Sequence, residues 1–246
     1  MGATERESAV VGFGPPLDLT VDAHVHTGFA AGRDSVGVVV SAADRAGLTS
    51  MTFADQVGPD TTWLPAYAEA IRRARGRTEV VLRVAAEVEV VGPDGWLAWP
   101  ADFGDLEAVS VAVSRLPHAT GPLGRREIRS LMIAGELTAD QVAERLVDAT
   151  VLGLERAARY VPAQLARPFS LLSQVGVDDM ILSGDVLDRL IDACAATGAV
   201  IEISEAWHSP SLPMVARLRE AGVPLLPASD ARYAGEVGRW QYLRRV

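Results

Sequence analysis

The strongest constraint on the fold is an alternation of apolar strands with helices along most of the 246-residue chain. About seven segments are short apolar runs, and most are followed by a stretch with helical spacing. Continuous apolar strands are typical of a parallel sheet that is buried on both faces. The length is also common for a single α/β barrel. The pattern therefore predicts either such a barrel or an open doubly wound sheet.

The boundaries of these elements follow from glycine, proline and capping residues. We expect an irregular leader over residues 1–17 and one domain over residues 18–246. Strands are predicted at residues 18–26, 49–54, 79–91, 106–113, 163–166, 199–204 and 223–228. Helices are predicted at residues 35–46, 63–75, 138–160, 186–196 and 211–220, with a partly helical segment from residue 234.

Composition excludes several classes of function. All 23 basic residues are arginine, so mechanisms that need a lysine amine, such as Schiff-base chemistry, are excluded. The net charge of −9 lacks the basic footprint of a nucleic-acid-binding protein. No apolar run is long enough to span a membrane, and the first residues do not resemble a signal peptide. We therefore expect a cytoplasmic protein without a nucleic-acid or membrane partner.

Two histidines end the first predicted strand. Because side chains two apart on a strand share a face, His24 and His26 should point to the same place. Two carboxylates also end apolar strands, those of Glu87 and Asp230. Burying a carboxylate is costly unless it is paired with a cation or binds a metal. The four residues predict a site for Zn²⁺, Mn²⁺ or Fe²⁺, with salt bridges to arginine as the alternative for each acid. With one cysteine in the chain, a cysteine-built zinc site is excluded.

Beyond these residues, a series of motifs resembles the PHP (polymerase and histidinol phosphatase) family from about residue 19 to the end of the chain. The H-x-H-T opening, the T-D-H strand end and the G-x-E strand correspond to His24–Thr27, Ala54–Gln56 and Ala85–Glu87. The later S-V-H, H-P, E-I-N and S-D-A-H marks correspond to Ser110–Ala112, Ala166–Pro168, Ile201–Ser204 and Ser229–Arg232. The resemblance implies a distorted (β/α)7 TIM-like barrel whose site holds three metal ions for phosphoester hydrolysis.

The departures from the family pattern affect the ligands of the second and third metals and spare those of the first. The resemblance assigns the first metal to His24, His26, Glu87 and Asp230, and all four ligands are present. The five histidines expected for the second and third metals are absent. Their positions hold Gly32, Gln56, Ala112, Arg167 and Arg232, and a register slip at Ala112 gives Ser114. We therefore expect a site remodelled from three metals to one.

Two of the lost histidines are replaced by permanent cations, which repel metal ions. Arg167 and Arg232 can bind a carboxylate or phosphate with paired hydrogen bonds, so we expect them to hold an anionic substrate. The alternative is that each pairs with a neighbouring acid such as Glu87 or Asp230. Asp55 is either a general base or a group that orients a metal ligand.

Three further residues, Gln56, Glu205 and His208, are candidate pocket-lining residues by position. For His118 and His208, each in a proline-containing loop, a surface or packing role is the alternative.

The preferred function is a metal-dependent, hydrolase-like enzyme acting on a small anionic metabolite with one divalent ion. Lyase or cyclase chemistry also suits such a site. Two alternatives stay open: a metal-poor pseudoenzyme used for binding or as a scaffold, and a phosphoesterase acting on histidinol phosphate. The sequence does not indicate the oligomeric state.

Overall fold

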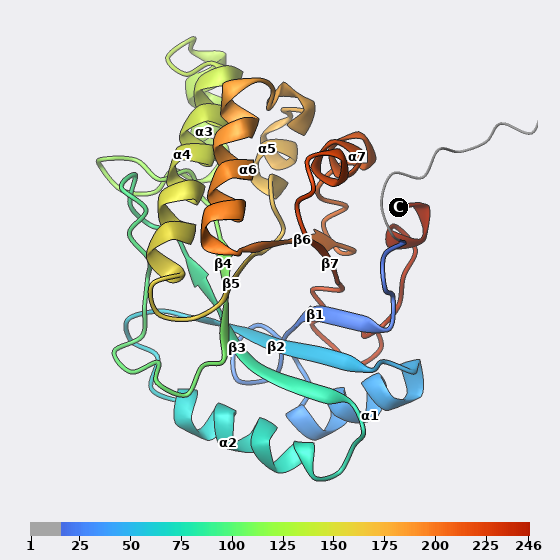
Figure 1. The fold of residues 1–246 in the computed structure, drawn as a ribbon. Helices are drawn as coiled ribbons and strands as arrows, with labels where there is room; N and C mark the ends of the chain where they lie inside the picture. The colour runs from blue at the N-terminus through green and yellow to red at the C-terminus, as the bar shows by residue number, and fades with distance from the viewer. Residues whose placement is uncertain (1–15) are drawn as a thin grey trace, which may run out of the picture.

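Seven parallel strands form one sheet in chain order in the computed structural model, which describes residues 16–246 (Figure 1). Every neighbouring pair in this sheet is parallel. The strands are β1 (Val21–Val25), β2 (Ser50–Val57), β3 (Val81–Glu89), β4 (Ala108–Ala112), β5 (Ala163–Leu165), β6 (Val200–Ser204) and β7 (Leu225–Ala228). The predicted strand at each of these positions is confirmed.

The sheet curls so that its first and last strands meet. The amide of His26 donates to the carbonyl of Ala231 over 2.9 Å, and the amide of Asp230 donates to the carbonyl of His24 over 2.9 Å. Val25 and Ala231 form an isolated parallel bridge. These contacts nearly close the sheet into a distorted (β/α)7 barrel, which excludes the open doubly wound alternative.

Helices cover the outside of this barrel, with α1 and α2 on one side and α3 to α6 on the other (Figure 1). The α-helices are α1 (Val36–Ala46), α2 (Leu64–Arg75), α3 (Arg125–Ile133), α4 (Ala139–Ala157), α5 (Ser170–Val175), α6 (Asp185–Thr197) and α7 (Leu212–Glu220). Two 3₁₀ turns, η1 (Asp179–Ile181) and η2 (Leu243–Arg245), complete the elements. Within residues 16–246, no helix is both long enough and apolar enough to cross a bilayer.

Two helices, α3 and α5, are absent from the prediction. Only Ile128 is buried on α3, so its apolar periodicity is weak, and α5 has six residues. The helix predicted over residues 138–160 is confirmed as α4, with Thr138 and Gln141 forming its capping box. The predicted leader lies outside the described residues except for residues 16 and 17, so its conformation stays a prediction.

The interior of the barrel is polar rather than filled by branched apolar residues. The side-chain amide of Gln164 donates to the carbonyl of Ala23 over 2.7 Å, to Ser110 Oγ over 2.8 Å and to Glu202 Oε1 over 2.6 Å. All of these groups are buried. Alanines 54, 85 and 108 form a separate small apolar cluster. A polar network this well satisfied positions carboxylates and imidazoles inside the barrel without leaving its amide unpaired.

The C-terminal segment is fastened across the barrel wall by Glu205. Its carboxylate accepts hydrogen bonds of 2.8–3.0 Å from the backbone amides of Gln241, Tyr242 and Leu243. The indole of Trp240 donates to the carbonyl of Leu19 over 2.9 Å. The segment predicted as partly helical contains only the 3₁₀ turn η2, because its backbone bonds go to this side chain instead.

We predict that Glu205→Ala lowers the free energy of unfolding by about 1–3 kcal/mol, because three amides lose their acceptor. Urea denaturation followed by circular dichroism measures the change. Glu220→Ala, at the exposed end of α7, serves as the control and should change stability far less. Equal effects of the two substitutions would contradict the fastening role and leave the carboxylate available for a ligand.

Candidate metal centre

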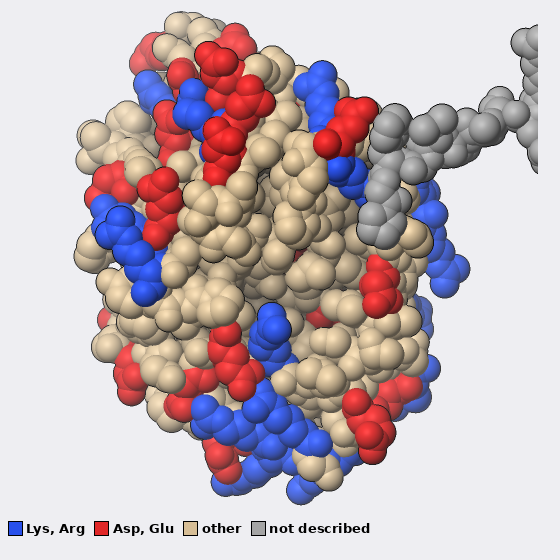
Figure 2. All heavy atoms as spheres, in the orientation of Figure 1, with Lys and Arg blue, Asp and Glu red and all other residues tan. Residues whose placement is uncertain are grey.

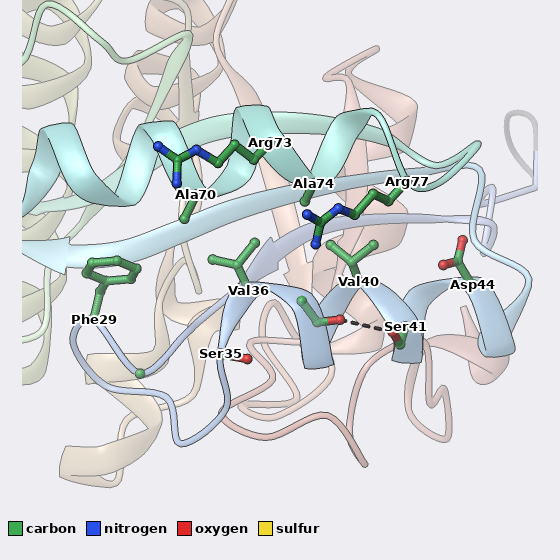
Figure 3. A pocket seen from close by; sticks show the side chains of 12 residues that line it. Phe29, Ser35, Val36, Val40, Ser41, Asp44, Ala70, Arg73, Ala74 and Arg77 are labelled. Atoms are coloured by element: carbon green, nitrogen blue, oxygen red, sulfur yellow. Dashed lines mark hydrogen bonds between the residues drawn. The ribbon is translucent and has the colours of Figure 1, made fainter.

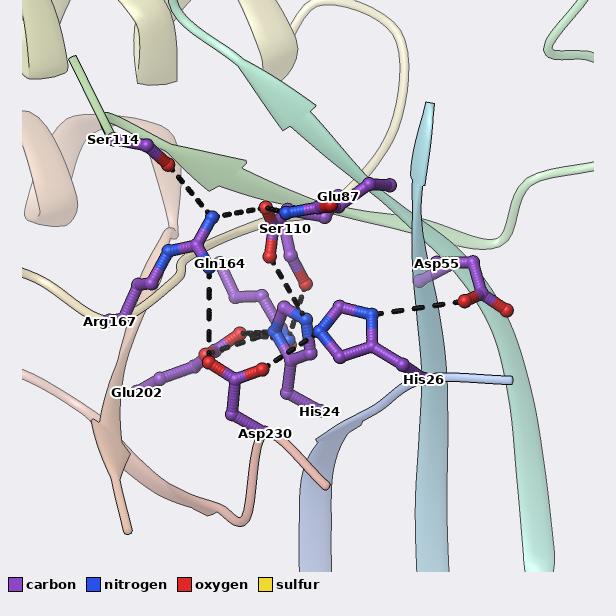
Figure 4. A network of polar contacts seen from close by, with 12 residues as sticks. His24, His26, Asp55, Glu87, Ser110, Ser114, Gln164, Arg167, Glu202 and Asp230 are labelled. Carbon is purple, nitrogen blue, oxygen red and sulfur yellow. Dashed lines mark hydrogen bonds and ion pairs between the residues drawn. The ribbon is translucent and has the colours of Figure 1, made fainter. Parts of the chain in front are cut away.

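His24, His26 and Asp230 meet at the carboxyl end of the barrel. One nitrogen or oxygen from each of the three lies within 4.8 Å of the others, and all three residues are buried. His24 is on β1, His26 follows it, and Asp230 follows β7 (Figure 4). The closure of the sheet between β1 and β7 brings these segments together. This end is where α/β barrels place their active sites.

His24 is oriented by a carboxylate from across the barrel. Its Nδ1 lies 3.0 Å and 3.1 Å from the two carboxylate oxygens of Glu202. Because a carboxylate accepts, Nδ1 carries a proton, and Nε2 is the ring atom left to face a ligand. His24 Nε2 lies 3.3 Å from Glu87 Oε2, and among the described residues neither atom has a hydrogen-bond partner. A carboxylate behind a histidine is the usual support for a metal-binding imidazole.

His26 contacts Asp230 directly, with its Nε2 2.8 Å from Asp230 Oδ1. Its Nδ1 has no partner within residues 16–246 and lies 3.8 Å from Asp55 Oδ1. The Asp55 carboxylate accepts from the amide of Thr27 over 2.9 Å and 3.1 Å, and also from the Thr27 hydroxyl. Asp55 thus holds the backbone after β1 and lies beside His26, and its two predicted roles stay predictions.

Glu87 has one oxygen in use and one free. Its Oε1 accepts from the side-chain amide of Gln56 over 2.9 Å and from the guanidinium of Arg167, while Oε2 faces His24. Burial alone would raise the pKa of Glu87, but the charge of Arg167 and the contact with His24 lower it to about 2. Glu87 is therefore ionised at neutral pH, as a metal ligand must be.

Arg167 fills the space beside this carboxylate. Its side chain is only 5% exposed and contacts Glu87, Ser114 Oγ at 2.9 Å and Asp230 at 3.9 Å (Figure 4). It reaches inward from a backbone with φ of 36°, in the left-handed region that non-glycine residues rarely adopt. These contacts match the predicted pairing with neighbouring acids, whereas its predicted role toward substrate stays a prediction.

The other predicted pocket residues lie outside the group of His24, His26 and Asp230. Arg232 is exposed and lines a cavity of about 350 Å³ that also reaches Asp230. Glu205 fastens the C-terminal segment, and His208 stacks on Tyr242 with ring centroids 4.7 Å apart. His118 Nδ1 lies 2.9 Å from Thr120 Oγ1 within its own turn. The structure therefore brings neither His118, His208 nor Glu205 into the cluster of His24, His26 and Asp230.

Several residues around the cluster were not among the predicted site residues, although Ser114 was named as the register alternative to Ala112. Glu202 orients His24, Gln164 bonds to Glu202, Ser114 contacts Arg167, and the indole of Trp207 donates to Asp230 Oδ2 over 2.5 Å. Glu202 carried a signal, since a carboxylate inside an otherwise apolar strand needs a buried partner. Trp207 carried none, because it lies in a turn after β6.

The charges of the cluster favour a bound cation. Four buried carboxylates surround the two imidazoles, against one guanidinium, that of Arg167. Burial alone would lower the pKa of His24, but its carboxylate neighbours, Glu202 first, outweigh burial and raise it well above its usual range. The four carboxylates are those of Asp55, Glu87, Glu202 and Asp230.

A larger groove lies elsewhere, between α1 and α2, with a volume of about 710 Å³ (Figure 3). Its floor is apolar, from Val36, Val40 and Ala74, and Arg73 and Arg77 extend over it. Figure 2 shows acidic and basic side chains mixed over one face of the molecule, with arginines gathered toward the α2 side. His24, His26 and Asp230, called the metal cluster below, do not line this groove, so the two places are separate.

Sequence comparison finds no matching family model and no matching curated protein. Solved structures do match. The crystal structure of a candidate histidinol phosphatase from Listeria monocytogenes covers 89% of this chain and 97% of its own, with a TM-score of 0.64 and 12% identity. An HpcH/HpaI aldolase from Desulfitobacterium hafniense covers 85% of this chain and 86% of its own, with a TM-score of 0.40 and 14% identity. The first match, together with the seven-stranded barrel, shows that the chain has the distorted (β/α)7 barrel of the PHP type.

Proposed function

We propose that the protein is a metal-dependent, hydrolase-like enzyme that uses one divalent ion to act on a small anionic metabolite. The observation that carries this proposal is the buried group of His24, His26 and Asp230, in which one nitrogen or oxygen from each residue lies within 4.8 Å of the others. Beside it, His24 Nε2 and Glu87 Oε2 lie 3.3 Å apart, and neither has a hydrogen-bond partner within residues 16–246. Leaving these two atoms buried and unpaired is costly, and a cation bound between them would remove that cost.

The donor set fits one ion well. Two imidazoles from His24 and His26 and carboxylates from Asp230 and Glu87 suit Zn²⁺, Mn²⁺ or Fe²⁺. A bound ion would supply Lewis-acid polarisation of the substrate or activation of a water molecule, for hydrolysis or for lyase or cyclase chemistry. Around it, Glu202 fixes the tautomer of His24, and Asp55 supports His26 and its loop.

Arg167 supports a site with one ion rather than several. Its guanidinium is buried against Glu87 where the family pattern places a second-metal histidine. A fixed positive charge there repels a second cation and neutralises part of the charge on an incoming anion. We propose this as its role in the reaction, with Gln56 donating to the same oxygen of the Glu87 carboxylate.

Two alternative functions are tested alongside this one. The fold match to a candidate histidinol phosphatase favours phosphate-ester hydrolysis, and phosphate release from histidinol phosphate tests it directly. The close pairing of Arg167 with Glu87 favours a metal-poor binding or scaffold protein, since it partly neutralises the cluster without an ion. A cytoplasmic location and the absence of a nucleic-acid partner stay predictions from the sequence.

We predict that chelated protein takes up about one Mn²⁺ or Zn²⁺ per chain in elemental analysis. Saturation with the ion raises the melting temperature, since an ion at a hundred times its dissociation constant adds about 2.7 kcal/mol of stability. The substitution His24→Gln should abolish this rise, and His118→Gln is the matched control that should keep it. A metal content near zero together with a melting temperature unchanged by chelation would favour the metal-poor alternative.

We predict that Glu202→Gln weakens binding of Mn²⁺ by about 10–100-fold, the usual cost of losing the partner of a metal-binding histidine. The amide can still accept from Nδ1, but it no longer raises the basicity of the ring. Titration calorimetry measures the change. An unaltered affinity would show that the imidazole of His24 is not a ligand.

Metal binding should also strengthen as the pH rises from 5.5 to 7.5. Because the pKa of His24 is raised well above its usual range, its ring carries a second proton near neutral pH when no metal is bound. A metal ion that binds the ring must displace this second proton. Each pH unit below that pKa should therefore cost roughly tenfold in affinity per proton displaced. Calorimetry in two buffers of different ionisation enthalpy counts the protons released. Zero protons released would exclude His24 from the binding site.

A further inference from the structure

The cavity of about 350 Å³ beside the metal cluster has two arginines at its mouth. Arg33 comes from the loop between β1 and α1, and Arg232 from the segment after β7. The amide of Arg33 donates to the carbonyl of Arg232 over 2.8 Å, so the two side chains start from adjacent backbones. Both side chains are exposed and line the same cavity.

Within residues 16–246 neither guanidinium forms an ion pair, whereas Arg72, Arg75 and Arg156 each contact an acid at 2.6–3.1 Å. Other exposed arginines such as Arg77 are also unpaired, so what distinguishes Arg33 and Arg232 is that they line one cavity together.

Two carboxylates, those of Glu236 and Asp230, also line the cavity. Glu236 accepts the backbone amide of Arg232 over 2.9 Å, and Asp230 is held by His26 and by the indole of Trp207. The N–H groups of the two guanidiniums therefore stay available to a ligand.

The inner end of the cavity reaches the metal cluster. Asp230 is part of its lining, and Trp207 and Tyr233 supply aromatic surface. The indole nitrogen of Trp207 donates to Asp230 Oδ2, which holds that ring at the boundary between the cavity and the cluster. The guanidinium of Arg167 lies 5.7 Å from the centroid of the same ring. A molecule filling the cavity would therefore have a metal-facing end, a flat middle against aromatic side chains, and an end at the two arginines.

We propose that the substrate carries two anionic groups on a small flat body, with one group at the metal and a second, a carboxylate, held by Arg33 and Arg232. This inference rests on the proposed function, because it needs the metal cluster to take the first group. Guanidinium pairs recognise a carboxylate by charge-assisted hydrogen bonds, and aromatic walls favour a planar body between the two ends.

Two probes separate these ends. Phenylphosphonate carries only the metal-facing group, and 4-carboxyphenylphosphonate adds the carboxylate. With Mn²⁺-loaded protein in titration calorimetry, we expect the second probe to bind at least about tenfold more tightly. The double variant Arg33→Gln/Arg232→Gln should lose this advantage while its affinity for phenylphosphonate stays the same. Arg77→Gln removes an exposed arginine of the α1–α2 groove and is the matched control, which should keep the advantage.

Failure of the arginine site and failure of the metal site give different results in these experiments. Equal affinity of the wild-type protein for the two probes, or an advantage that survives in the double variant, overturns the arginine site while leaving the metal site in place. Failure of Mn²⁺ and of phenylphosphonate to bind overturns the proposed function and, with it, the two-ended substrate. Benzoate binding to metal-free protein, followed by NMR, then tests Arg33 and Arg232 alone. Weaker benzoate binding in the double variant supports a carboxylate site at the two arginines, and unchanged binding overturns it.

Discussion

The closure of the sheet between β1 and the segment after β7 is the constraint on which the site depends. Two backbone hydrogen bonds of 2.9 Å, one between Asp230 and His24 and one between His26 and Ala231, join segments more than 200 residues apart in the chain. Across the barrel, Glu202 on β6 places a second carboxylate behind the first imidazole, 3.0 Å from His24 Nδ1. The barrel interior accommodates such groups because it is itself polar, built around the side-chain amide of Gln164. The same backbone contacts that close the barrel therefore also bring His24, His26 and Asp230 together.

Arg167 then decides what this cluster can hold. A buried guanidinium against Glu87 needs the carboxylate as its partner, and the carboxylate in turn keeps its second oxygen free for a cation. On the proposed function, the arrangement puts a permanent charge where an exchangeable metal would otherwise bind. The one proposed ion would then lie on the side of Glu87 that faces His24.

The sequence allowed the strand positions and the grouping of His24, His26 and Asp230 to be predicted, because both depend on local pattern: apolar runs, and polar residues where those runs end. It did not allow the two roles of Arg167 to be separated, because the side-chain direction follows from a left-handed backbone that no periodicity reveals. Trp207 and Arg33 were missed for a related reason: both lie in loops, and only the folded chain brings them beside Asp230. The helix α3 was missed because it buries a single large side chain, Ile128.

The two kinds of arginine in this site illustrate why burial, more than residue type, determines chemistry. Arg167 is buried, so its charge is compensated by Glu87 and acts on the metal cluster at short range with little screening. Arg33 and Arg232 are exposed and lack acidic partners within residues 16–246, so water and salt screen them until a ligand excludes the solvent. A substrate that spans the cavity would desolvate the outer pair while leaving the inner one unchanged. Affinity for the outer group would therefore fall with salt, whereas binding of the ion inside would be much less sensitive to it.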